Sequence, residues 1–198
     1  MTISPEFLKN TWADMQEISL NILDIAQNSI RAGATLIEID IAENIPEDMF
    51  VFTVKDNGSG MSEEMVRSVI DPFVTTRTTR KIGLGIPLLR SMAQAAGGDL
   101  KIESTLGEGT LVTATFVHSS IDRQPLGDIS SVMVSLISMN PDIDFVYTHS
   151  YNESDFSLDT RELRTVLEGV SFKEPSVALW IGEYVNEGLT EIYGGADL

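Results

Sequence analysis

The stretch from Pro5 to Arg31 carries apolar residues at three- and four-residue spacing, which predicts an amphipathic helix. Polar residues recur at the same spacing on another face of this helix. Gly33 follows as the expected helix terminator. Two strands are predicted next: 35–42, where apolar and polar residues alternate, and 49–55, which ends at a run of turn-forming residues.

The middle of the chain alternates between short periodic segments and polar connections. A polar Thr/Arg-rich loop is expected over 71–82, because this stretch has no apolar period. Gly107-Glu108-Gly109 is expected to connect two strands as a tight turn. The other predicted elements are helices over 62–70 and 87–96 and strands over 100–104 and 110–117.

Composition changes near Ser119, where basic residues become scarce. Residues 1–118 hold 16 acids and 9 bases, whereas residues 119–198 hold 14 acids and 4 bases. We therefore expect two domains, 1–118 and 119–198. The second is expected to hold a helix over 127–139, strands over 143–149 and 155–158, a helix opened by Asp159 and a helix over about 175–191.

The 198 residues carry a net charge of −17 and no cysteine. Such a charge repels phosphate backbones, which argues against nucleic acid as a general partner. No apolar run is long enough to cross a membrane, and no secretory signal is visible, so we expect a cytoplasmic protein. The two histidines, His118 and His149, are expected to be ordinary strand-end residues.

Asp56-Asn57-Gly58-Ser59-Gly60 comes directly after a predicted strand. A carboxylate at this place is able to accept a hydrogen bond from an exocyclic amine such as that of adenine. Gly58 and Gly60 would let the backbone approach a flat base closely. The alternative is a plain turn between two elements, in which Asp56 bonds only its own backbone.

Asp24, Asn28 and Arg31 share one face of the first predicted helix, because they are four and three residues apart. The Asn28 amide oxygen suits Mg²⁺, Arg31 suits a phosphate, and Asp24 suits the orientation of a water molecule. The alternative is a solvated helix face without chemistry.

Basic residues gather just before a predicted helix start, which favours an anion site. These residues are Arg77, Arg80 and Lys81, followed by Gly83, Leu84 and Gly85. The alternative is a mobile surface loop. Thr110 opens a strand, where its hydroxyl is able to reach a base directly or through water.

These motifs occur in an order that resembles the GHKL superfamily of ATP-binding domains, over about residues 14–118. The segment NSIRAGATLIEIDI is similar to the N-box region of MutL-type ATPases, whereas DPFVTT and GLGIPLLRSMAQAAGGDLKIESTLGEGTLVTATF resemble the catalytic domain of histidine kinases more closely. The resemblance implies an α/β (α+β) sandwich of the Bergerat type, a mixed sheet with helices on one face. A small C-terminal α/β module would be added to it.

The same resemblance implies ATP and Mg²⁺ as cofactors and gives individual residues a role. Asn28 would bind Mg²⁺ and Arg31 a phosphate, Asp56 would bind the adenine amine with Gly58 and Gly60 beside it, Phe73 would open the lid, Gly83, Leu84 and Gly85 would face the phosphates, and Thr110 would support the base. Arg77, Arg80 and Lys81 belong to the same expected nucleotide site.

The chain departs from the family pattern at three places. Asp24 stands where hydrolytic members carry Glu, so its side chain is one methylene shorter and slow turnover is expected. Lys81 stands where kinase relatives often carry Gly. Residues 1–13 cannot supply a phosphoacceptor helix, which argues against autophosphorylation on histidine.

The leading hypothesis is an Mg-ATP-binding protein that acts in signalling or regulation through ATP hydrolysis or phosphoryl transfer to a partner protein. One alternative is a serine/threonine protein kinase of the anti-sigma type. Another is a non-enzymatic interaction module in which ATP orders the lid. Residues 119–198 contain no motif that names the partner, and a homodimer stays open.

Overall fold

The computed structural model describes residues 17–70 and 85–194. The order of elements along the chain is α2-β1-β2-α3-α4-β3-β4-α5-β5-β6-α6-α7. The bounds are α2 Ile18–Arg31, β1 Leu36–Asn44, β2 Met49–Asp56, α3 Glu63–Ile70, α4 Gly85–Ala95, β3 Asp99–Thr105, β4 Gly109–Val117, α5 Ile129–Met139, β5 Asp144–Tyr151, β6 Ser154–Asp159, α6 Thr160–Val166 and α7 Pro175–Ile192.

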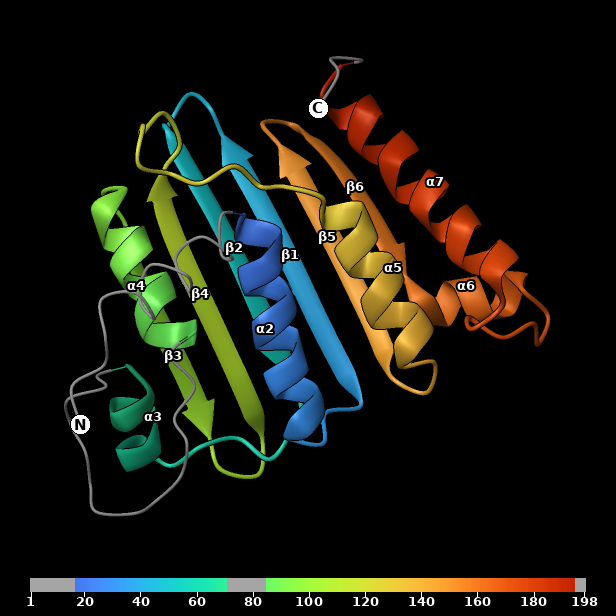
Figure 1. Ribbon diagram of the computed structural model, residues 1–198, viewed down its shortest axis with the longest axis horizontal. Helices are drawn as coiled ribbons and strands as arrows, with labels where there is room; N and C mark the ends of the chain where they lie inside the picture. Colours follow the sequence, from blue (N-terminus) through green and yellow to red (C-terminus); the bar gives the residue numbers. More distant parts are fainter. Residues whose placement is uncertain (1–16, 71–84, 195–198) are drawn as a thin grey trace, which may run out of the picture.

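The strands form one mixed six-stranded sheet in the order β3-β4-β2-β1-β5-β6. Every neighbouring pair is antiparallel except β1 and β5, which run parallel. A parallel pair needs a crossover connection. The chain from β1 to β5 therefore passes through β2, β3 and β4 and returns over the sheet through α5, which lies beside α2 (Figure 1).

Helices α2, α4 and α5 lie over one face of the sheet, as expected from the sequence (Figure 1). The burial pattern of the strands explains why the helices cover one face. Buried and more exposed residues alternate along β1, β2 and β4, so one face of the sheet is apolar. In β1 the isoleucines Ile37, Ile39 and Ile41 are buried, while Glu38 and Asp40 alternate with them on the other face. Within the described residues, the β1 side chains of this other face are exposed or half-buried.

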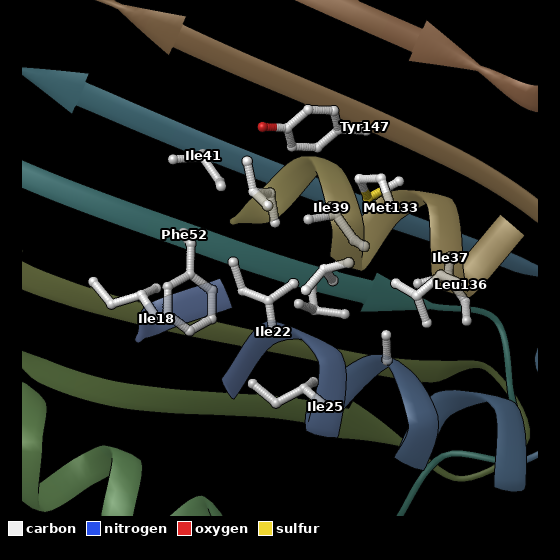
Figure 2. Close-up of a cluster of buried hydrophobic side chains, with 14 of the residues drawn as sticks. Ile18, Ile22, Ile25, Ile37, Ile39, Ile41, Phe52, Met133, Leu136 and Tyr147 are labelled. Atoms are coloured by element: carbon white, nitrogen blue, oxygen red, sulfur yellow. The ribbon is translucent and has the colours of Figure 1, made fainter. Parts of the chain in front are cut away.

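The core fills the layer between this face and the helices. Figure 2 shows Ile18, Ile22 and Ile25 of α2 in this layer, with Ile18 beside Phe52 of β2 and Ile22 nearer the isoleucines of β1. Met133 and Leu136 of α5 enter the same layer. The apolar residues of each helix, three or four positions apart, therefore pack against apolar residues of the strands that are two positions apart. This is the pattern that the sequence predicts.

Residues after 119 extend the first sheet: β5 pairs with β1, and α5 and α7 pack against each other. Both parts of the chain contribute to one hydrophobic core. The division into domains 1–118 and 119–198 stays a prediction. The sequence predicts one helix from Pro5 to Arg31. In the structure, α2 forms the second half of this segment, Ile18–Arg31, and residues 5–16 lie outside the described ranges.

A polar network is buried inside this otherwise apolar layer, at the end of β1 opposite the Asp56 loop. Its centre is Glu43, whose side chain is 8% exposed. His118 Nε2 lies 2.8 Å from Glu43 Oε2, His149 Nε2 lies 3.1 Å from Oε1, and the Tyr193 hydroxyl donates to Oε1. The Tyr147 hydroxyl lies 2.8 Å from His149 Nδ1. The network joins β1, β5 and the residues that follow β4 and α7.

This network corrects the expectation for the histidines. His118 does follow a strand, but His149 lies inside β5 and is completely buried. Burial alone would raise the pKa of Glu43, yet the hydrogen bonds from His149, Tyr193 and His118 outweigh burial and lower this pKa to about 2. The folded protein therefore holds Glu43 as a carboxylate.

Acid should weaken the fold through Glu43. A carboxyl with a pKa lowered from 4.5 to about 2 stabilises the fold above pH 4.5 and loses that contribution as the pH falls toward 2. We expect Glu43→Gln to lower the free energy of unfolding by about 3 kcal/mol at pH 7, and by much less at pH 3. Urea denaturation across this pH range measures both values.

Glu38→Gln is the matched control, because Glu38 pairs with Lys55 on the open face of the sheet. Its effect should stay below about 1 kcal/mol at either pH. Equal stability of Glu43→Gln and the wild type at pH 7 would show that the buried network does not stabilise the fold.

Candidate functional site

Asp56 is the last residue of β2 and is 9% exposed. Its carboxylate has two fixed partners. Ser29 Oγ, from α2, donates to Oδ2 at 2.7 Å, and the Gly58 backbone N–H donates to Oδ1 at 2.8 Å. A carboxylate has about four lone-pair positions, so two hydrogen bonds orient Asp56 and leave it able to accept more.

The loop after Asp56 is fastened on both sides. Asn57 Oδ1 accepts the backbone N–H groups of Thr35 and Leu36, at 2.8 and 3.0 Å. The Ser59 N–H donates to the carbonyl of Ala32 at 2.9 Å. The loop is thus bound to the connection between α2 and β1, which keeps Asp56 below the last turn of α2.

Two glycines of this loop lie where a side chain would not fit. A Cβ at Gly60 would lie 1.9 Å from the Thr105 carbonyl oxygen, and Gly60 has a φ of +62°. A Cβ at Gly58 would lie 3.0 Å from the Ala32 carbonyl oxygen. The glycines therefore allow the loop to pass close to the β3–β4 turn and to the end of α2.

Thr110 faces the same place from β4, where it is the register partner of Asp56. Its Oγ1 lies 2.9 Å from Ser104 Oγ, on β3. Ser104 Oγ also accepts the backbone N–H of Met61 at 2.8 Å. Strands β2, β4 and β3 thus bring their polar ends together at one edge of the sheet.

The polar face of α2 completes the site. Asp24 is half-buried, while Asn28 and Arg31 are exposed. A Cβ at Gly85, the first residue of α4, would lie 2.3 Å from Asp24 Oδ2, so the start of α4 lies directly against this carboxylate. Arg31 Nη1 donates to Asn28 Oδ1 at 2.9 Å.

The structure brings the two predicted clusters together. Ser29 is the neighbour of Asn28 in α2 and bonds Asp56, so the last turn of α2 and the end of β2 meet. Asp24, Asn28, Arg31, Asp56, Gly58, Gly60, Gly85 and Thr110 are all described, and their assigned roles stay predictions. Phe73, Arg77, Arg80, Lys81, Gly83 and Leu84 lie outside the described residues.

Sequence reasoning missed Ser29 and Ser104 as members of the site. The signal for Ser29 was its position on the apolar face of α2, where it is 3% exposed. A buried hydroxyl on such a face needs a partner, and Ser29 has two, the Ile25 carbonyl and Asp56. Ser104 gave no comparable signal, because it is a polar residue on a half-exposed strand.

Two negative findings apply to residues 17–70 and 85–194. These residues contain no group of three or more His, Asp or Glu side chains arranged to hold a metal ion. They also contain no helix long and apolar enough to cross a membrane.

The fold and the site together have the form of an ATP-binding α/β sandwich: a sheet edge with an aspartate and glycines, facing the polar side of a helix. A family model agrees, because the model for histidine kinase-, DNA gyrase B-, and HSP90-like ATPases matches residues 13–120. The chain belongs to this family, and its matched region is an ATP-binding domain of the histidine-kinase-like type.

Sensor histidine kinase WalK from Bacillus subtilis is 33% identical over 114 residues, which are 53% of this chain and 18% of WalK. Sporulation kinase D from the same organism is 30% identical over 120 residues, 61% of this chain and 23% of that kinase. The curated relatives are much longer proteins, of which the match spans 14% to 23%.

Among solved structures, the Aquifex aeolicus MutL ATPase domain complexed with ADP is similar with a TM-score of 0.45 and 15% identity. This similarity covers 91% of this chain and 70% of the MutL domain. The family model ends at residue 120. Helices α5, α6 and α7 and strands β5 and β6 therefore lie beyond the matched region.

Removing the Ser29 hydroxyl tests how firmly Asp56 is held. We expect Ser29→Ala to lower the free energy of unfolding by about 1.5–3 kcal/mol, because it takes a charge-assisted hydrogen bond from a buried carboxylate. Urea denaturation at pH 7 measures this loss. Ser91→Ala, an exposed serine of α4 that bonds its own helix, is the control and should cost about 0.5 kcal/mol or less. Equal effects of the two changes would contradict a special role for Ser29.

Proposed function

We propose that this protein binds Mg-ATP between α2, the Asp56 loop and the start of α4, and that it acts in signalling. The reaction would be ATP hydrolysis or transfer of the γ-phosphate to a partner protein. One observation supports this most: a buried aspartate, fixed by Ser29 and Gly58 N–H, retains free acceptor capacity at the edge of the sheet. Its neighbours are glycines and a threonine, which suit a flat base.

Asp56 would accept the exocyclic amine of adenine. The amine is a donor, and both oxygens of the carboxylate are acceptors, so the pairing favours adenine over guanine, whose corresponding position carries a carbonyl. Gly58 and Gly60 keep the loop thin where the base would lie. Thr110 Oγ1, already bonded to Ser104, would contribute a hydroxyl beside Asp56.

Asn28 fits Mg²⁺ in the chemistry of its donor. Its amide oxygen is neutral, exposed to solvent and already in contact with a cationic group, Arg31. Mg²⁺ accepts such an oxygen together with waters and phosphate oxygens. The metal would supply neutralisation of the phosphate charge, and Asn28 would hold it beside the polar face of α2.

The start of α4 is suited to phosphates. Helix N-termini attract anions through their free N–H groups, and the first turn of α4 carries no acid. Asp24 lies against Gly85 at this end of the helix. Asp24 would orient a water molecule toward the phosphates, with a side chain one methylene shorter than the Glu of hydrolytic relatives. Slow turnover follows from this role.

The named relatives support a role in signalling, because WalK is a sensor histidine kinase and sporulation kinase D is a kinase by name. The partner would be recognised through the part of the chain beyond the family match, after residue 120. A non-hydrolysing module that uses ATP only to gate partner binding is the second candidate. The short side chain of Asp24, in place of Glu, favours it.

Asp56→Asn should abolish ATP binding, because the amide would present an N–H₂ group or a single oxygen where the base needs a fixed acceptor. Isothermal calorimetry with Mg-ATP measures this. Asp40→Asn, on the open face of the sheet, is the control and should bind as the wild type does. If Asp56→Asn binds ATP with wild-type affinity, the adenine base does not bind at Asp56.

Asp24→Asn should keep nucleotide binding and lose hydrolysis, because the amide retains the shape of the side chain and removes its charge. Phosphate release and ATP affinity are measured on the same protein. If turnover is unchanged in this variant, Asp24 has no part in the reaction. If the wild type itself releases no phosphate, a partner protein is first recovered with a non-hydrolysable ATP analogue. Transfer of labelled γ-phosphate to this partner would indicate a protein kinase, and no transfer would indicate a gated module.

A further inference from the structure

The charge of Arg31 has no carboxylate partner in the described part of the chain. Its guanidinium bonds two neutral amide oxygens, Asn28 Oδ1 at 2.9 Å and Gln27 Oε1 at 3.5 Å. Of the other eight cations in residues 17–70 and 85–194, all but Arg123 and Lys173 are neutralised by ion pairs. These are Lys55 with Glu38, Arg67 with Glu63, Arg90 with Asp99, Lys101 with Glu103, Arg161 with Asp159 and Arg164 with Asp144.

Carboxylates are abundant in this chain of net charge −17, yet none pairs with Arg31 in the described residues. Arg31 is exposed in the last turn of α2, where the negative end of the helix dipole stabilises its charge without a carboxylate. It therefore retains its full capacity to bind an anion. It lies one turn beyond Gln27 and on the same helix face as Asp24 and Asn28.

The contact with Asn28 fixes the orientation of that amide. A guanidinium has only donors, so the atom of Asn28 that faces Arg31 must be the oxygen. The same oxygen is the only atom of the side chain that can bind a metal ion, because the amide nitrogen carries two hydrogens. Arg31 and a divalent cation thus need the same atom, and two cations beside one oxygen repel each other.

We propose that Arg31 is an internal counter-cation that exchanges places with Mg²⁺. In the nucleotide-free protein the guanidinium occupies the Asn28 oxygen. When Mg-nucleotide binds, the metal takes this oxygen, and Arg31 turns to a phosphate oxygen within reach of the same helix face. The inference rests on the proposed function, since it needs ATP at this site.

The exchange has a measurable consequence. Without Mg²⁺, Arg31 supplies the positive charge that the phosphates need, so ATP binding in the wild type depends only weakly on the metal. Without Arg31, Asn28 is free for Mg²⁺, and the metal becomes the main cation of the site. The ratio of ATP affinities in Mg²⁺ and in EDTA therefore reports the exchange.

The test compares the wild type with Arg31→Gln, which removes the charge from an exposed position and should leave the fold intact. Calorimetric titration with ATP is done in Mg²⁺ and in EDTA. We expect the change from Mg²⁺ to EDTA to weaken wild-type binding less than about tenfold, and to weaken binding by Arg31→Gln at least a further tenfold. In Mg²⁺ the loss of affinity in Arg31→Gln should be smaller than in EDTA, because the lost phosphate contact is partly offset by the released oxygen of Asn28.

Two variants make the result specific. Arg31→Lys keeps a cation and should restore binding in EDTA. Lys173→Gln removes the same charge from the exposed segment between α6 and α7, and should leave both affinities unchanged. If Lys173→Gln reproduces the effect of Arg31→Gln, net charge alone explains it and the exchange is wrong.

The remaining outcomes are decisive as well. Equal weakening in Mg²⁺ and in EDTA would make Arg31 a fixed phosphate contact, and unchanged affinities would make it a bystander. Either result overturns the exchange. Both leave the proposed function standing, provided that Asp56→Asn has abolished ATP binding. If Asp56→Asn binds ATP normally, the proposed function fails first.

Discussion

The hydrogen bond from Ser29 to Asp56 is the interaction on which the site depends. It joins the last turn of α2 to the end of β2 over 27 residues of chain, inside a mostly apolar layer. A buried carboxylate without a partner is costly, so helix and strand cannot shift relative to each other without losing this bond. The polar face of α2 is thereby held beside the glycine loop.

The part of the chain after residue 120 also holds α2 in place, through hydrogen bonds to the first turn of this helix. The carbonyls of Pro125 and Leu126 accept the first two N–H groups of α2, those of Ile18 and Ser19. Both ends of the helix are thus fixed, the first by the connection to α5 and the last by Asp56. A partner that moved this connection would act on α2 directly, and α2 carries Asp24, Asn28 and Arg31 of the candidate site.

The apolar period of the chain predicted the elements well, because helix and strand spacing depend only on neighbours in the sequence. Strand β2, predicted over 49–55, is Met49–Asp56. The predicted pairing of Asn28 with Asp56 in one site came from the order of motifs and stays a prediction; the structure shows that Ser29, next to Asn28, bonds Asp56. Ser29 and His149 were missed for the opposite reason: their partners are 27 and 106 residues away in the chain, and no local pattern records such contacts.

Two buried carboxylates on one sheet, those of Glu43 and Asp56, differ in how many hydrogen bonds they can still accept. This difference distinguishes a residue that stabilises the fold from a residue of the candidate site. Glu43 receives three side-chain hydrogen bonds from His118, His149 and Tyr193, and few of its lone pairs are left. Asp56 receives two and lies beside glycines at an open edge. The first carboxylate is nearly saturated and can only stabilise the fold. The second has free acceptor capacity, and the proposed nucleotide site rests on this difference.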